Sequence, residues 1–297
     1  MALVVCSLQG AYAPPHLGHK GLAKLVGEKL LELYPESMIK LFYMPTSDIS
    51  KKPSIYKNPA GVDKAEYVSE EDRFNMLQFY CDELNTDPKL EFSVSRIEYE
   101  IQRIKGDTAT IHTLEKLRSQ YPDATLVLAM GEDNARQLPW WSGIAKWPTL
   151  IDKLLLVDRD GQAPAKNTLY EIKSYKNSAS QGFNKPTWAK LNFNNQVLLP
   201  GIKSALEALA KKTELLPQPP GFSSSEVRET LHLFYKAPRH FTTLEFFCGK
   251  AVARYLVRHS ICNPHRKNGG ARKKTINKKC APTNVTRSKT QARTRRR

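Results

Sequence analysis

The 297-residue sequence contains no apolar run of the roughly 18 residues needed to cross a bilayer, which argues against a membrane-spanning protein. Its N-terminus has neither a basic segment nor an extended apolar stretch, so a secretory signal is not indicated. The five cysteines are odd in number and share no CxxC spacing, so neither a disulfide framework nor a zinc site is indicated. These absences predict a soluble, intracellular protein with reduced thiols.

Acidic residues are missing from residues 260–297, which contain 13 of the 46 Lys and Arg residues. Without this segment the net charge of +17 falls to +4, because 33 basic residues then face 29 acidic ones. Few large aliphatic side chains are present there to offset the entropy of ordering. We expect a folded domain over residues 1–259 and a disordered basic tail over residues 260–297.

The predicted tail suits salt-sensitive contact with nucleic acid or another polyanion, although an extension without a function would have the same composition. The expected location is the cytoplasm, with the nucleus as the alternative because of the basic tail.

Short apolar runs alternate with helical patterns along the domain. Buried strands are predicted at 2–9, 39–44, 92–97, 124–130 and 153–157. Helices are predicted at 18–35, 70–84, 110–120, 223–235 and 242–257. This order predicts an α/β fold, a Rossmann-like parallel sheet with right-handed crossovers and helices on both faces. Residues 160–200, rich in Asn, Ser and Lys, are expected to form a surface insertion.

The first motif with chemical content is Gly-Ala-Tyr-Ala-Pro-Pro-His-Leu-Gly-His at residues 10–19, between the first predicted strand and helix. A helix N-terminus offers unpaired N–H donors and the positive end of its dipole, which suits phosphate. His16 and His19 are spaced to direct ring N–H groups at one oxyanion, and Gly18 lets the backbone approach it. The motif predicts phosphate binding.

A second motif, Ser-Ser-Ser-Glu-Val-Arg at residues 223–228, also begins a predicted helix. Serine hydroxyls at the cap and Arg228 one turn later could hold a phosphate chain, the arginine by bidentate contact. Serine-rich helix caps are common, so this motif indicates phosphate binding only in combination with the first motif.

Together the two motifs resemble the HxGH nucleotidyltransferase superfamily, and further blocks narrow the resemblance to the nicotinate/nicotinamide mononucleotide adenylyltransferase family. Bacterial members of that family read roughly G-x-F-D-P-x-H-x-G-H, M-P, S-Y-T-x-D-T-L, G-A-D, a Trp-bearing loop and I-S-S-T-x-I-R. The corresponding blocks here lie, in the same order, at residues 10–19, 44–45, 108–114, 131–133, 138–141 and 222–228. The resemblance covers about residues 1–258, apart from the 160–200 segment.

The resemblance implies adenylyl transfer from ATP to nicotinate or nicotinamide mononucleotide, giving deamido-NAD or NAD and pyrophosphate, with Mg²⁺ on the polyphosphate. It implies catalytic roles for His16, His19 and Arg228. The ATP-binding residues it implies are Gly10, Tyr12, His16, Gly18, His19, Gly131, Asp133, Arg159, Ser223, Ser224 and Arg228. It places Thr110 and Trp141 at the pyridine ring, where an indole face can stack on the cationic ring, and the neighbouring Trp140 is the alternative for this stacking.

The chain departs from the family pattern at Ala13, Ala109, His112 and Glu132, which bears on substrate preference and rate. One alternative is an HxGH nucleotidyltransferase with another acceptor, such as phosphopantetheine. Another is a non-catalytic nucleotide-binding regulator tethered to nucleic acid. A class I aminoacyl-tRNA synthetase relative is disfavoured, because Lys-Met-Ser-Lys-Ser is absent.

Overall fold

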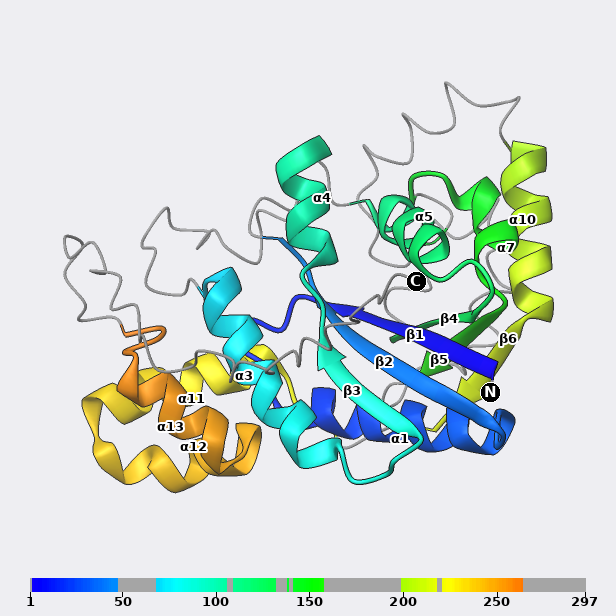
Figure 1. The fold of residues 1–297 in the computed structure, drawn as a ribbon. Coiled ribbons are helices and arrows are strands. Elements are labelled where there is room, and N and C mark those ends of the chain that lie inside the picture. Colours follow the sequence, from blue (N-terminus) through cyan, green and yellow to red (C-terminus); the bar gives the residue numbers. More distant parts are fainter. Residues whose placement is uncertain are drawn as a thin grey trace, which may run out of the picture. The chain divides into compact units, whose positions relative to one another are not determined.

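The structure is a computed structural model that describes residues 2–47, 68–105, 109–131, 138, 141–157, 199–217 and 221–263 (Figure 1). The chain divides into two units, Met1–Pro264 and His265–Arg297, and every described residue belongs to the first. The predicted tail, from residue 264 on, and nearly all of the predicted insertion therefore lie outside the described residues. Within the described ranges, no helix has the length and apolar character required to cross a membrane.

Six parallel strands form one sheet in the order β3-β2-β1-β4-β5-β6. The strands are β1 (Ala2–Gly10), β2 (Ser37–Pro45), β3 (Leu90–Val94), β4 (Thr125–Gly131), β5 (Lys153–Val157) and β6 (Thr213–Leu216). The strand order reverses between β1 and β4, and in doubly wound sheets ligands bind at the carboxyl ends of strands beside such a reversal. The predicted α/β fold is confirmed.

Helices cover both faces of the sheet (Figure 1). One face carries α1 (Leu17–Leu33), α3 (Glu70–Leu84), α11 (Ser224–Lys236), α12 (Phe241–Cys248) and α13 (Lys250–Arg258). The other carries α4 (Ile97–Lys105), α5 (Thr110–Gln120), α7 (Trp147–Leu150) and α10 (Leu199–Lys211). Short 3₁₀ helices lie at η3 (Ile144–Lys146) and η5 (Pro238–His240).

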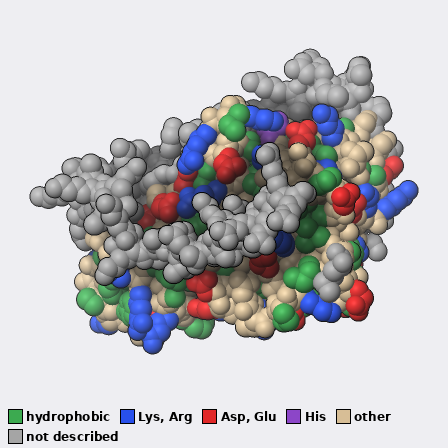
Figure 2. Space-filling model, in the orientation of Figure 1, with side chains coloured by type: hydrophobic (Ala, Val, Ile, Leu, Met, Phe, Trp, Pro, Cys, Tyr) green, Lys and Arg blue, Asp and Glu red, His purple; other side chains and the backbone are tan. Residues whose placement is uncertain are grey.

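The core follows from the alternation of side chains along each strand. In β1, Val4, Cys6 and Leu8 are buried under α1 and α3, whereas Val5 is buried on the opposite face. Strands buried on both sides read as continuous apolar runs, which is why the sequence pattern reveals them. On the face shown in Figure 2, acidic and basic side chains are interspersed, as expected for a domain whose charges nearly cancel.

Two predicted elements differ clearly from the structure. The strand predicted at 92–97 begins at Leu90 and ends at Val94, where the Ser95 hydroxyl accepts a hydrogen bond from the Ile97 backbone N–H (3.2 Å) and α4 starts. The single helix predicted at 242–257 is two helices, α12 and α13, which meet at Gly249 with φ +75° and ψ 158°. The pattern analysis also missed α4, α7, α10 and β6, of which α7 and β6 have only four residues each.

Replacing Gly249 with alanine is expected to lower the free energy of unfolding by about 1–3 kcal/mol, because its backbone conformation is almost exclusive to glycine. Gly201 in α10 is the matched control, since a Cβ there would meet nothing within 4 Å. Gly201→Ala should stabilise the protein by up to about 1 kcal/mol. Urea unfolding of both variants measures the difference, and equal effects would contradict the backbone explanation.

Candidate active site

The loop after β1 leaves the sheet at the strand-order reversal and ends at His16, the N-cap of α1. Its turn depends on Gly10 and Tyr12. Tyr12 has φ +50°, and its hydroxyl donates to the Leu8 carbonyl at 2.7 Å. The Tyr12 ring lies so close that a Cβ on Gly10 would come within 2.8 Å of it. Both residues therefore shape the loop, whatever else they contact.

His16 and His19 lie one above the other at the start of α1, with ring centroids 3.7 Å apart. The His16 backbone N–H donates to His19 Nδ1 at 3.2 Å. Because Nδ1 accepts this bond, a neutral His19 ring carries its proton on Nε2. His16 is 3% exposed, whereas His19 is partly exposed, with the Tyr12 ring edge-on to it at 4.7 Å. Gly18 is buried in the first turn of the helix.

The second motif meets the first across the fold. Ser223 caps α11 by accepting from the Glu226 backbone N–H. The Ser224 hydroxyl donates to the Pro14 carbonyl at 2.9 Å, across 210 positions of sequence. Arg228 Nη1 donates to the Ala13 carbonyl at 2.7 Å, and its Nη2 contacts Ser225. The start of α11 thus contacts the loop that leads to His16 and His19.

Thr110 contacts the end of β1, and Trp141 packs against the core on the face of the sheet that carries α5. Thr110, the first residue of α5, donates its hydroxyl proton to Gln9 Oε1 at 2.9 Å, at the end of β1. Trp141 is partly buried, with its ring 5.5 Å from that of Trp147. Gly143, two residues later, has φ +69°, and a Cβ on it would lie 2.7 Å from the Ile111 side chain. The segment of residues 141–143, called the Trp141 loop below, therefore packs against the start of α5, next to Thr110.

Gly131 ends β4, the neighbour of β1 on this side of the sheet. Asp133 and Arg159, also predicted in ATP binding, lie outside the described residues. In the described part of the chain, no group of three or more His, Cys, Asp or Glu side chains is arranged to hold a metal ion. The described residues therefore do not form a metal site of their own.

Sequence reasoning missed two buried charged residues near this loop, Arg73 and Glu98. The Arg73 side chain is fully buried, and its Nη1 donates to the Ala11 and Thr46 carbonyls. The available signal was the position of Arg73 on the apolar face of α3, at helical spacing from Met76 and Leu77.

Glu98, on α4, is 2% exposed and accepts a hydrogen bond from the Thr113 hydroxyl at 3.3 Å. Burial raises the pKa of the Glu98 carboxyl from 4.5 to about 8, although the Thr113 hydrogen bond and the positive charge of Arg73 oppose this change. The Glu98 carboxyl near Arg73 thus stays protonated near neutral pH.

No family model matches the chain, but curated proteins and solved structures are similar to it. A probable nicotinate-nucleotide adenylyltransferase from Chlorobaculum parvum is 27% identical over 152 residues, 51% of this chain and 66% of that protein. One from Leptospira interrogans is 25% identical over 173 residues, 57% of this chain and 75% of that protein. This chain is similar in sequence to nicotinate-nucleotide adenylyltransferases. The match spans 56% of a third such protein, from Chlorobium phaeobacteroides, at 30% identity.

The fold is also that of a solved relative of these enzymes. The Plasmodium falciparum nicotinic acid mononucleotide adenylyltransferase complexed with NaAD has a TM-score of 0.51 with this chain at 13% identity. The likeness covers 88% of this chain and 98% of that one. At this identity the likeness shows a shared fold, whereas the sequence matches show similarity to proteins named nicotinate-nucleotide adenylyltransferases.

Proposed function

We propose that this protein transfers the adenylyl group of ATP to nicotinate or nicotinamide mononucleotide. An oxygen of the mononucleotide 5′-phosphate attacks the α-phosphorus of ATP, the bond from that phosphorus to the bridging oxygen breaks, and pyrophosphate leaves. The observation that carries the proposal is the contact of Ser224 and Arg228 with the loop that bears His16 and His19. Two motifs that each suit phosphate binding, from opposite ends of the domain sequence, contact each other there.

The reaction requires no protein nucleophile, so the protein contributes position and charge. His19 would donate from Nε2 to the phosphate oxygens, because its Nδ1 is held by the His16 backbone. The N-terminus of α1 adds backbone N–H groups and the positive end of the helix dipole. Arg228 would add a fixed positive charge at the β- and γ-phosphates, as the family resemblance implies, together with Ser223 and Ser224.

The pyridine ring of the mononucleotide would lie near the end of β1 and the start of α5, away from α11. Thr110 and Gln9 form a hydrogen-bonded pair there, and the Trp141 loop packs beside them. A hydroxyl and an amide together offer both donors and acceptors to the substituent on the ring. The indole of Trp141 would stack on the ring face.

Magnesium would enter with ATP. Mg²⁺ keeps several waters and binds substrate phosphates readily, which fits a described surface without a cluster of acidic or histidine ligands. It would neutralise charge on the polyphosphate, while the residues named above position the reacting groups.

Pyrophosphate release from ATP, measured with purified full-length protein and each mononucleotide in turn, tests the proposal. Turnover with either one is expected, with none when the acceptor is omitted. The His19→Asn variant serves as the control for contaminating enzymes. Binding of ATP without turnover on either mononucleotide would contradict the proposal, and turnover with phosphopantetheine instead would assign another acceptor.

A further inference from the structure

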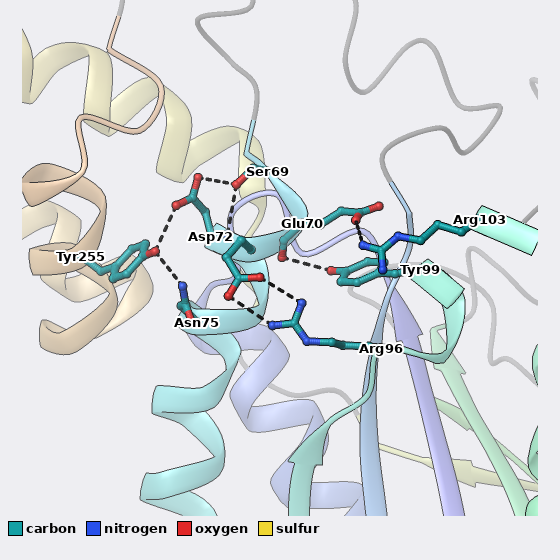
Figure 3. A network of polar contacts seen from close by, with 9 residues as sticks. Ser69, Glu70, Asp72, Asn75, Arg96, Tyr99, Arg103 and Tyr255 are labelled. Atoms are coloured by element: carbon teal, nitrogen blue, oxygen red, sulfur yellow. Dashed lines mark hydrogen bonds and ion pairs between the residues drawn. The ribbon is translucent and has the colours of Figure 1, made fainter. Parts of the chain in front are cut away.

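The first turn of α3 connects the site to its surroundings through a dense set of polar contacts (Figure 3). Glu70 accepts a hydrogen bond from the Ser47 hydroxyl at 3.0 Å, in the segment after β2. The Glu70 carbonyl accepts from the Tyr99 hydroxyl of α4 at 3.2 Å. Glu71 pairs with both terminal nitrogens of Arg96, which lies between β3 and α4, at 3.0 and 3.2 Å.

The same turn is tied to the C-terminal helix. The Tyr255 hydroxyl of α13 donates to Asp72 at 3.0 Å and accepts from Asn75 at 3.1 Å (Figure 3). Ser69 caps the helix by accepting from the Asp72 backbone N–H. The turn is therefore held from several directions at once, and any side chain it directs into the protein is well fixed in position.

Arg73 is that inward side chain. It is 0% exposed, and its Nη1 donates to the carbonyl of Ala11 at 3.0 Å and to the carbonyl of Thr46 at 2.5 Å. Its guanidinium carbon lies 5.9 Å from the centroid of the Tyr99 ring. Burying a cation is costly, and an apolar side chain of similar size would fill the same space at a lower cost in free energy. The hydrogen bonds of Arg73 to the Ala11 and Thr46 carbonyls indicate what the guanidinium contributes.

Both carbonyls belong to loops just beyond the sheet. Gly10 and Pro45 are the last paired residues of β1 and β2, and Ala11 and Thr46 follow them directly. The Thr46 backbone N–H also donates to the Gly10 carbonyl at 3.0 Å. One nitrogen of Arg73 thus links the segment after β1 to the segment after β2, one residue beyond the last paired residues of the two strands. It does so directly before Tyr12, where the backbone turns with φ +50° toward the histidines.

We propose that Arg73 is a positioning residue for adenylyl transfer, because it sets the direction in which the loop of residues 10–16 leaves β1 and so places His16 and His19. The inference rests on the proposed function. Arg73 also puts a fixed positive charge behind the loop to which we assign phosphate binding. A lysine at this position keeps the charge, but its shorter side chain does not bring its nitrogen to the place of Nη1 between the two carbonyls.

Arg73→Lys is the main test, with Arg73→Met removing the charge as well. Misplaced catalytic groups chiefly affect the transition state, so kcat is expected to fall about ten- to hundredfold while KM for ATP changes less than about threefold. Arg96→Lys, an exposed change at an ion pair of the same turn, is the matched control and should retain kcat within about twofold. All rates are measured well below the unfolding midpoint of each variant.

A second readout does not depend on turnover. In the parent protein the ¹⁵N shifts of His19 should report one tautomer, protonated at Nε2, and Arg73→Lys should show a mixture. Parental kcat together with parental His19 shifts would overturn the inference, and so would failure of Arg73→Lys to fold, which would make Arg73 a stability residue only. If the parent protein itself lacks turnover, the proposed function fails while the His19 shifts still decide the role of Arg73.

Discussion

Replacing His19 with asparagine is expected to lower kcat by about a hundred- to thousandfold while the protein stays folded. The asparagine Oδ1 takes the place of Nδ1 and can still accept from the His16 backbone N–H, which the parent ring does at 3.2 Å. Nothing replaces the donor at Nε2. The cap of α1 therefore survives, and the proposed contact with the phosphate oxygens is lost.

His19→Gln keeps more of the parent chemistry. Glutamine at the third position of a helix can accept from the N-cap backbone N–H through its side-chain oxygen, so stability should stay close to parental, and its longer side chain carries an amide N–H donor toward the position of Nε2. This variant should retain about tenfold more activity than His19→Asn. Steady-state kinetics and thermal unfolding of the two variants separate the roles. Parental kcat in His19→Asn would show that His19 acts only as part of the helix cap.

Replacing Glu98 with glutamine is expected to stabilise the protein at pH 8 by on the order of 4 kcal/mol, with little effect near pH 4.5. Burial raises the pKa of the Glu98 carboxyl from 4.5 to about 8. Between these two values the unfolded chain has released the proton and the folded protein still holds it. Stability therefore falls as pH rises through this window, by about 1.4 kcal/mol for each step of one in pH.

Glutamine stays neutral and keeps an oxygen for the Thr113 hydroxyl, which is 3.3 Å from the Glu98 carboxyl. Urea unfolding at pH 5, 6.5 and 8 should thus show a much flatter pH dependence in Glu98→Gln than in the parent protein. Glu100→Gln, at an exposed position of the same helix, controls for the loss of one negative charge. A parental slope in Glu98→Gln would mean that another group accounts for the loss of stability.

The predictions from sequence succeeded where the signal is local. The buried strands read as apolar runs, and α3 and α5 begin and end at the predicted residues, because caps and helical spacing are properties of neighbouring residues. The motifs marked the loop between β1 and α1 and the start of α11. Short elements such as β6 were not predicted, since four residues carry too little periodicity to distinguish a strand from a loop.

The break at Gly249 shows the limit of periodicity. The apolar spacing continues through this glycine, so the pattern alone predicts one helix over 242–257, whereas the backbone turns at φ +75°. Glycine is tolerated within helices as well as at their ends, and the packing of α12 and α13 decides between the two.

The sequence by itself determined the fold class, the place of His16 and His19 at the start of the first helix, and the family that this chain resembles. Only the tertiary structure joined Arg228 to Ala13 and placed the guanidinium of Arg73 on two loops at once. It also showed that Glu98 is buried and that the His16 backbone sets the proton on His19. These features depend on contacts between distant segments, and the pKa of a carboxyl or the direction of a ring proton follows from what surrounds it.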